Sequence, residues 1–507
     1  MLGRPLRCAA LLLWLLAVGR GLYCVGAPSA IWTIDFAGLG GVMRKSGSLV
    51  VFFCAVLLGI TSTANAQNKS TIAIEHVTVI DGTGRPAIPD ATVIIEGDRI
   101  TRVSRTEIPI PAGAQRIDGR GKYLIPGMMD VHIHLHGGFT KPPDERAGIR
   151  ALQSYLYCGV TTVLDVGNNP DFIFGLRDKE RNGEIVSTRL LAAGGIVTYP
   201  GSHGSDPNMS TNVDSWPQAV PALDKALAYH PDFLKLTYEE EGWGTRPLIP
   251  LLPVPLMQHI IEYYNDHGVR STVHVSNEIR AREAIFVGVD TLAHPDIQAP
   301  ISDRFVKLMA ARQTPFASTL TIGEGYSRLA DHPEFLDQPL YQAVLEPEEI
   351  QRLKTTEHDK QVRNRWAKWM AIMTPVAQEN IHKIDTAGGI VALGTDQSIG
   401  PAVHRELELL VGGGISPMDA IRIATLNSAR FLGKDRDMGS VEEGKIADLV
   451  LLSADPLADI NNTKKIGSVF KAGQLIDRSK LDLPVNRKAA ADDVAPMLMY
   501  PIENALE

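Results

Sequence analysis

The sequence predicts an α/β fold organised as a (β/α)8 barrel of parallel strands. Short apolar runs alternate with helical patterns, and this alternation is typical of parallel strands joined by crossover helices. The chain has 507 residues, of which 44% are hydrophobic, so it is long enough for a barrel and a smaller accessory domain. The eight predicted strands lie near residues 125–134, 160–166, 189–197, 232–238, 271–276, 290–295, 314–320 and 390–396.

The first of these runs ends in Asp130-Val131-His132-Ile133-His134. Side chains alternate faces along a strand, so Asp130, His132 and His134 point the same way, and imidazoles spaced like this can bind one metal ion. A lone His-x-His is more often a pair of ordinary polar residues, so the pattern needs support from elsewhere in the chain. We expect Asp130 to accept structural hydrogen bonds below the ligands.

Polar residues also stand in or at the end of four later apolar runs. The C-terminal ends of successive strands are where a (β/α)8 barrel assembles its catalytic site, so we expect these residues to meet the two histidines of the first strand. They are Lys235, His274, His294 and Asp396.

The residue types in this set suit divalent metal ions. The first-strand histidines supply neutral imidazole nitrogens and Asp396 supplies a carboxylate, which suits zinc or a similar first-row metal. His274 and His294 would hold a second ion. Lys235 can be a ligand only if its charge is removed, because an ammonium group has no lone pair. The alternative for this lysine is a salt bridge to a nearby glutamate at position 239 or 240.

The order and spacing of these residues resemble the amidohydrolase superfamily, and within it the imidazolonepropionase-like metal-dependent hydrolases. That group includes prolidase-type and arginine-type carboxypeptidases and ochratoxin-type amidases. The resemblance extends from about Ile72 to Asp477, and its most diagnostic pieces are residues 127–134, 394–396 and 439–450.

The resemblance implies a mechanism. In binuclear members, the lysine that ends the fourth barrel strand is carboxylated by CO2, and Lys235 matches that position. A hydroxide shared by the two ions would attack a substrate carbonyl, while Asp396 accepts the proton and passes it to the leaving nitrogen. The expected reaction is hydrolysis of an amide or peptide bond, with a dipeptide or an N-acyl amino acid as substrate.

Four residues are weighed as substrate contacts. His203, in the glycine-rich loop after the third strand, and Tyr238 match positions that contact the substrate in related carboxypeptidases. Ordinary hydrogen bonding within the loops is the alternative for both residues. His404 and Arg405, after the eighth strand, are weaker candidates.

Two other functions remain open. The first is a mononuclear cyclic-amide hydrolase or deaminase of the imidazolonepropionase type, which would lack the carbamate. The second is a relative without catalysis, in which the barrel is a binding or scaffold module. The sequence contains neither a P-loop pattern nor a Gly-x-Ser-x-Gly nucleophile elbow.

β patterns return at both ends of the chain, in residues 71–80 and 91–103 and again in 447–453 and 468–476. In the families that the chain resembles, the two ends meet in a small β-sandwich beside the barrel. The expected domains are therefore a leader at 1–66, a sandwich from 67–124 and 436–507, and a barrel at 125–435.

The first 66 residues have the features of a signal peptide. Arg44 and Lys45 precede an apolar tract, which ends in Ala64-Asn65-Ala66. Met43 stands just before this pattern, so synthesis could begin there. We expect export to the periplasm or the medium. The alternative is a membrane anchor made from this tract and an earlier apolar tract at residues 8–18.

Composition limits the partners. The formal net charge is −8, and the leader carries five basic residues and one acidic residue, so the remaining chain is more acidic still. An acidic surface argues against nucleic acid and anionic membranes as partners. The resemblance implies a small amide or peptide substrate as the partner, and a homo-oligomer is possible. Cys158 is the only cysteine beyond the leader, and we expect a buried thiol.

The connection between the seventh and eighth strands is much longer than the others. It contains residues 348–384, a charged, helix-favouring stretch. This insertion either covers the site or forms a solvated helical hairpin.

Overall fold

Parallel strands form the centre of the molecule. The computed structural model describes residues 70–240, 248–294 and 299–487, so the predicted leader and the Met43 start lie outside the described residues. The described residues from Ser70 onward form one compact unit. One parallel sheet contains β6 (Met128–Ile133), β7 (Val160–Asp165) and β8 (Arg189–Ala192).

A second parallel sheet has seven strands in the order β10-β9-β11-β12-β13-β14-β15. Each of the eight predicted strand regions contains a strand, so the parallel α/β part of the prediction is confirmed. The strands are β9 (Ile196–Thr198), β10 (Ser210–Asn212), β11 (Phe233–Thr237), β12 (Arg270–His274), β13 (Thr291–Ala293), β14 (Phe316–Ala317) and β15 (Val391–Ala392).

Hydrogen bonds connect the two sheets at both borders. The N–H of Val131 on β6 donates to the carbonyl of Leu393, just after β15, at 2.9 Å. Ile133 and Gln397 form a parallel bridge at the same border. At the other border, the N–H of Asp232 donates to the carbonyl of Ala192 at 2.8 Å. The first and last strands of the predicted series therefore lie side by side.

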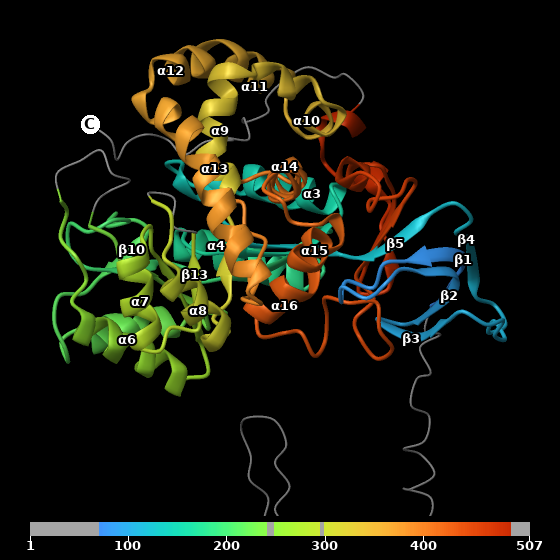
Figure 1. The fold of residues 1–507 in the computed structure, drawn as a ribbon, viewed down its shortest axis with the longest axis horizontal. Coiled ribbons are helices and arrows are strands. Elements are labelled where there is room, and N and C mark those ends of the chain that lie inside the picture. The colour runs from blue at the N-terminus through green and yellow to red at the C-terminus, as the bar shows by residue number, and fades with distance from the viewer. Residues whose placement is uncertain (1–69, 241–247, 295–298, 488–507) are drawn as a thin grey trace, which may run out of the picture. The chain divides into compact units, whose positions relative to one another are not determined.

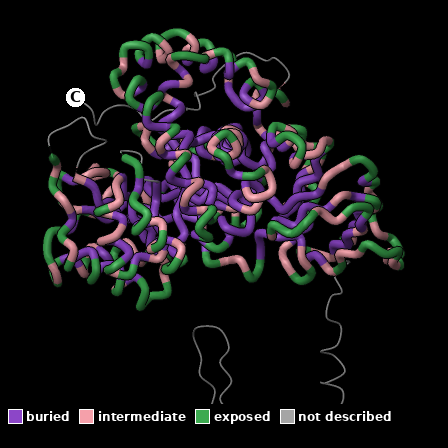
Figure 2. Tube along the Cα trace, in the orientation of Figure 1, coloured by how far each residue is buried: buried purple, intermediate pink, exposed green. Residues whose placement is uncertain are grey.

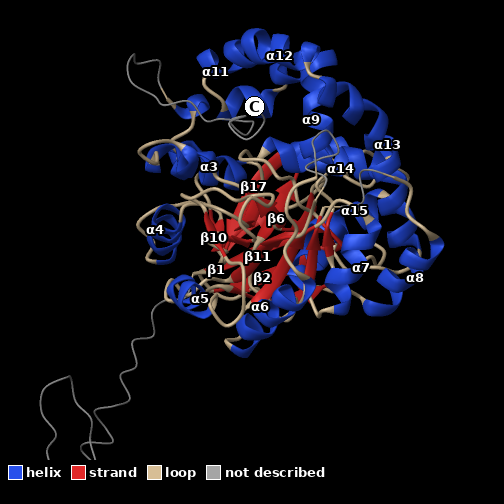
Figure 3. Ribbon diagram, turned by 90° about the vertical axis from the view of Figure 1, so that its left-hand side faces the viewer, coloured by secondary structure: helices blue, strands red, loops and turns tan. Residues whose placement is uncertain are grey.

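Helices follow the strands and surround them (Figure 3). Side chains that cap helix N-termini explain where several begin: Asp144, Asn169, Asn277 and Ser302 each accept a backbone N–H of the first turn. The helices are α3 (Glu145–Tyr157), α4 (Pro170–Arg181), α5 (Val220–Leu227), α6 (Val254–Asp266), α7 (Glu278–Phe286), α8 (Asp303–Arg312), α14 (Pro401–Gly412), α15 (Pro417–Arg422) and α16 (Ser428–Phe431).

Both ends of the described chain contribute to a separate eight-stranded sheet (Figure 1). Antiparallel pairing of β16 with β5 joins the two ends, with Leu449 opposite Pro126. Apolar side chains such as Ile74, Val93 and Phe470 form its own fully buried core. The division of this region into a two-layer sandwich stays a prediction. The strands are β1 (Thr71–Val79), β2 (Ile88–Glu96), β3 (Arg99–Ser104), β4 (Gln115–Asp118), β5 (Tyr123–Pro126), β16 (Leu449–Leu452), β17 (Ile466–Lys471) and β18 (Gln474–Leu475).

The long connection between β14 and β15 is helical (Figure 1). Its first and last helices pack against each other. The apolar face of the last helix is buried, while Trp369 and Ile372 on its outer side are 42% and 64% exposed. The helices are α9 (Leu320–Asp331), α10 (Pro339–Val344), α11 (Pro347–Arg352), α12 (His358–Arg363) and α13 (Arg365–Thr386).

Buried residues lie in the interior of the fold and exposed residues at its surface. The buried residues concentrate along the central strands and the inner faces of the helices, and exposed residues cover the periphery (Figure 2). Cys158 is fully buried, as expected from the sequence. In the part of the chain that the structure describes, no helix is both long and apolar enough to cross a membrane.

Candidate metal centre

Three predicted ligands meet where β6 ends beside the segment that follows β15. The Oδ1 atom of Asp396 lies 3.8 Å from Nε2 of His132 and 3.5 Å from Nε2 of His134. His132 is fully buried, whereas His134 and Asp396 retain some exposure. The three side chains therefore form a mostly buried cluster in which His134 and Asp396 remain partly accessible to solvent.

The backbone turns sharply at two of the strand ends. Asp396 and His294 have φ values of 54° and 71°, in the left-handed region that residues with a Cβ rarely adopt. Asp130 helps hold the Asp396 segment, because its carboxylate accepts the N–H of His132 at 3.2 Å and the N–H of Thr395 at 3.0 Å. Asp130 thus accepts structural hydrogen bonds below the cluster, as predicted.

The tautomer of His134 bears on metal binding. Its Nδ1 atom lies 2.7 Å from the carbonyl oxygen of Gly167. A carbonyl only accepts hydrogen bonds, so Nδ1 carries the proton and Nε2 keeps a lone pair. This lone pair faces an Asp396 carboxylate oxygen at 3.5 Å, and two such atoms cannot hydrogen-bond to each other while both lack a proton. The spacing agrees with the roughly 3.4 Å expected between two ligands of one tetrahedral zinc ion.

Lys235 projects from β11 into the same cluster. Its side chain is buried, and Nζ lies 3.4 Å from Nε2 of His132. Burial lowers the pKa of Lys235 from its usual value, although the carboxylates of Asp396 and Asp165 oppose this decrease. The alternative salt bridges to Glu239 and Glu240 do not describe this structure, since those carboxylates pair with His274 and Arg280.

His274 and His294 lie next to one another at the ends of β12 and β13. Their ring centroids are 4.5 Å apart, and His294 is also 4.6 Å from His132. Nδ1 of His294 lies 2.9 Å from the hydroxyl oxygen of Thr319. The structure therefore brings all six predicted metal ligands into one region, with the His294 ring close to both His132 and His274.

Glu239 was not predicted as a site residue. Its fully buried carboxylate contacts Nε2 of His274, and the His203 ring stacks on the His274 ring with centroids 4.3 Å apart. Ligand atoms of these three residues lie within 4.8 Å of one another, and those of His132, His294 and Asp396 also do. The signal available in the sequence was a carboxylate four residues beyond Lys235, just past the end of the same strand.

The two predicted substrate contacts are placed differently. His203 faces the centre, through its stacking on His274. Tyr238 is buried, and its hydroxyl donates to Glu283 at 2.7 Å, while Arg280 lies over its ring. Its substrate contact stays a prediction.

The weaker candidates after the eighth strand have structural partners. The ring nitrogens of His404 lie 3.0 Å from Thr463 Oγ1 and 3.1 Å from the carbonyl oxygen of Cys158. Arg405 forms ion pairs with Glu324 and Glu408.

Burial sets the charge state of the cluster. It lowers the pKa of His134 to about 3 and those of His132 and His294 well below the usual value, and the nearby Lys235 charge adds to each decrease. The imidazoles are therefore neutral, with lone pairs available to a metal ion. Burial also raises the pKa of the Asp396 carboxyl, against the opposing effect of Lys235.

A parallel α/β fold with neutral histidines, a lysine and an aspartate at its strand ends is typical of metal-dependent hydrolases. Residues 123–476 match the model of the Amidohydrolase family. The chain belongs to this family, and the superfamily resemblance inferred from the sequence is confirmed. It is therefore an amidohydrolase-type protein.

Similar proteins span most of the chain. It is 24% identical over 438 residues to an ochratoxinase from Aspergillus niger, covering 78% of this chain and 85% of that protein. It is 22% identical over 403 residues to an imidazolonepropionase from Pseudomonas paraeruginosa, and the match covers 74% of this chain and 90% of that protein. A solved Xaa-Pro dipeptidase with bound methionine in its active site superposes with a TM-score of 0.64 at 23% identity. The superposition covers 80% of this chain and 100% of that chain. This last similarity concerns the fold.

Proposed function

We propose that this protein is an exported binuclear metal-dependent hydrolase that cleaves a dipeptide or an N-acyl amino acid. The observation that carries the proposal is the 3.5 Å approach of Nε2 of His134 to Oδ1 of Asp396, with three further histidines and Lys235 beside them. The geometry suits ligands converging on a cation.

The proposed scaffold is a (β/α)8 barrel with a β-sandwich made from both chain ends. The hydrogen bonds between Val131 and Leu393 and between Asp232 and Ala192 support closure of the strands into a barrel. Barrel, sandwich and leader are proposed with the boundaries given above.

The proposed ligands divide into two groups. His132, His134 and Asp396 would hold one ion, His274 and His294 would hold the other, and Lys235, as a carbamate, would supply oxygen ligands to both. Zinc is the metal we propose, because imidazole and carboxylate ligands suit it.

Carboxylation of Lys235 is supported by its surroundings. A buried ammonium beside divalent cations is strongly unfavourable, and the glutamates nearest in sequence pair with other residues. The neutral amine can add to CO2, forming an N–C bond and releasing one proton. The product is anionic and has the oxygen lone pairs that an ammonium lacks.

Asp396 is proposed to move the proton during hydrolysis. Divalent ions bound at this centre would lower the pKa of water from 15.7 to about 7 and polarise a carbonyl group. The Asp396 side chain retains 14% exposure, and its carboxylate can accept a proton from the attacking water and deliver it to the leaving nitrogen. His203 and Tyr238 are proposed to orient the substrate.

The remaining proposals concern the setting of the enzyme. Residues 1–66 would direct export from a start at Met43, and the acidic chain would act on a small molecule without a nucleic-acid or stable membrane partner. A homo-oligomer is compatible with this assignment.

A mononuclear cyclic-amide hydrolase or deaminase is the second candidate function. It is favoured by the contact between Nε2 of His274 and the Glu239 carboxylate. Because this histidine already has a hydrogen-bonding partner, it need not be the ligand of a second metal ion. The similarity to an imidazolonepropionase points the same way.

Metal content distinguishes these candidates. Wild type and Lys235→Ala would be expressed from Met43 with zinc and bicarbonate, analysed for metal, and assayed on dipeptides and N-acyl amino acids. We expect two ions per chain in wild type and a loss of metal and turnover together in the variant. The exposed Lys225→Ala is the matched control. One ion in every protein, with activity retained in Lys235→Ala, would favour the mononuclear function, and absence of both metal and turnover would favour a scaffold.

A further inference from the structure

The carboxylate of Asp165 is fully buried at the end of β7, and the proposed hydrolysis does not use it. β7 pairs with β6 in parallel, and Asp165 is opposite Ile133, the residue before His134. A buried carboxylate is costly unless hydrogen-bond donors compensate for its lost hydration. The donors that surround Asp165 therefore identify the segments that it holds in place.

Both oxygens of the Asp165 carboxylate accept hydrogen bonds. Oδ2 accepts the backbone N–H of Leu135 at 2.8 Å and the side-chain amide of Asn168 at 2.9 Å. Oδ1 accepts the backbone N–H of Gly167 at 3.0 Å. Leu135 directly follows His134 in the chain, and the His134 ring contacts the carbonyl of Gly167. One carboxylate therefore holds both the backbone that carries His134 and the backbone that its ring contacts.

Asn168 connects the same two segments a second time. Its side-chain amide donates to the carbonyl of Leu135 at 3.0 Å, in addition to its bond with Asp165. Asn168 is fully buried, and a Cβ atom built on Gly138 would lie 1.7 Å from its Oδ1 atom. Close packing therefore keeps the asparagine in this position, and the ends of β6 and β7 are fixed relative to each other.

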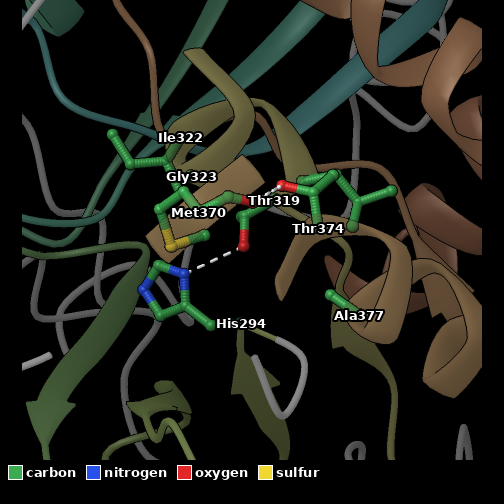
Figure 4. Close-up of a pocket in the computed structure, with 8 residues that line it drawn as sticks. His294, Thr319, Ile322, Gly323, Met370, Thr374 and Ala377 are labelled. Carbon is green, nitrogen blue, oxygen red and sulfur yellow. Dashed lines mark hydrogen bonds between the residues drawn. The ribbon is translucent and has the colours of Figure 1, made fainter. Parts of the chain in front are cut away.

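The carbonyl of Gly167 determines which nitrogen of His134 carries the proton. It lies 2.7 Å from Nδ1 and can only accept, so Nε2 keeps the lone pair that faces Asp396. The contact of His294 is different, because the Thr319 hydroxyl beside its Nδ1 atom can either donate or accept (Figure 4). The proton position on His134 therefore depends on the placement of one backbone carbonyl.

The close approach of Gly167 to the His134 ring requires glycine. A Cβ atom at this position would lie 2.6 Å from Cγ1 of Ile196 and 3.1 Å from Cε1 of His134. Both values are shorter than ordinary van der Waals contacts between carbon atoms. A side chain at position 167 would therefore displace either the ring or the carbonyl that contacts it.

We propose that Asp165 is a positioning residue of the metal centre, which holds the Gly167 carbonyl against Nδ1 of His134 and so keeps Nε2 available to an ion. The inference rests on the proposed role of His134 as a ligand, and it adds the residue that controls the orientation and tautomer of this ligand. Groups that orient metal-binding histidines typically change metal affinity by about 10- to 100-fold. Asp165 acts through hydrogen bonds and is not itself a ligand in this proposal.

Zinc affinity gives the first test. Asp165→Asn keeps the size of the side chain but replaces one acceptor oxygen with an NH2 group, which opposes the surrounding donors. Competition with a chelator should show a zinc dissociation constant about 10- to 100-fold higher for at least one bound ion. The matched control is Asp290→Asn. The Asp290 carboxylate accepts the N–H of Ser271 at 2.9 Å near the start of β12, at the opposite end of that strand from His274, so zinc affinity should not change.

The tautomer of His134 gives a second test, which a general loss of stability would not change. NMR of the ring nitrogens would be recorded on metal-free protein with isotope-labelled histidine, and His134→Gln would identify the signals. We expect the proton on Nδ1 in wild type and a larger share on Nε2 in Asp165→Asn. Gly167→Ala should have the same effect and serves if Asp165→Asn does not fold. A wild-type proton on Nε2, or an unchanged tautomer in the variants, would overturn the proposal.

The two tests also separate this inference from the proposed hydrolysis. Wild type that binds zinc and has the expected tautomer, yet cleaves no dipeptide or N-acyl amino acid, would contradict the hydrolysis and leave the role of Asp165 intact. Full zinc affinity and turnover in Asp165→Asn would overturn the role of Asp165 and leave the hydrolysis intact.

Discussion

The carboxylate of Glu406 accepts the backbone N–H of Thr321 at 2.8 Å and lies 2.8 Å from the hydroxyl oxygen of the same residue. Glu406 is fully buried on α14, and Thr321 is in the first turn of α9. The same carboxylate also accepts the N–H of Leu320 and the hydroxyl of Ser318. Glu406 thus holds the start of the helix that follows the strained Thr319, whose hydroxyl oxygen lies beside His294.

Removal of Glu406 should destabilise the protein. Glu406→Ala would leave several buried donors without their acceptor, and each such loss costs about 1 to 3 kcal/mol. We expect the free energy of unfolding to fall by at least about 2 kcal/mol in urea denaturation. The exposed Glu348→Ala should change it little. Equal stabilities of the two variants would show that Glu406 does not anchor α9.

His404 should make stability depend on pH. Burial lowers the pKa of His404 to about 4, below its ordinary value of 6.5, so the unfolded chain binds a proton more readily than the folded chain. The stability contribution is therefore complete above pH 6.5 and is lost as the pH falls toward 4, to a total of about 3 kcal/mol.

Comparison with His404→Gln isolates this effect. Unfolding free energies of both proteins would be measured in urea from pH 4 to 8. Wild type should lose more stability than the variant on acidification, so the two curves should converge toward pH 4. Parallel curves would show that His404 does not titrate differently in the folded and unfolded states.

Asp396→Asn should separate metal binding from turnover. The amide keeps one oxygen that can contact a cation but cannot accept a proton at neutral pH, so we expect much of the metal to remain and kcat to fall by roughly 10² to 10⁴. Elemental analysis and steady-state kinetics measure the two effects. Asp266→Asn, at an exposed site on α6, serves as the control. Near-normal turnover of the Asp396 variant would remove this residue from proton transfer.

Cys158 should resist alkylation in the folded protein. Its thiol is fully buried, and burial raises its pKa to about 12, so very little thiolate exists at pH 8. Iodoacetamide labelling followed by peptide mass spectrometry would follow this cysteine separately from those of the leader. We expect slow labelling in buffer and fast labelling in guanidinium chloride. Comparable rates under both conditions would show that the thiol is accessible in the native state.

Much of the candidate site was predictable because it follows local rules. Alternation along a strand fixed His132 and His134 on one face, and the common edge of parallel strands predicted their meeting with Lys235 and Asp396. The parallel strands followed from the alternation of strand and helix, whereas β10 at the edge of the seven-stranded sheet was not predicted. Export and the start at Met43 stay predictions, since they concern residues outside the described part of the chain.

Tertiary structure decided the features that depend on contacts between distant segments. Glu239 points to His274 on the next strand, although its place near Lys235 in sequence suggested a salt bridge with the lysine. Glu406 and Thr321 are 85 residues apart, and the Gly323 and Met370 contact joins two helices of one insertion. Sequence alone determined which residue types stand at the strand ends, because side-chain direction along a strand is a local property. The partner of each buried side chain was decided only by packing, because that choice depends on every segment that competes for the same space.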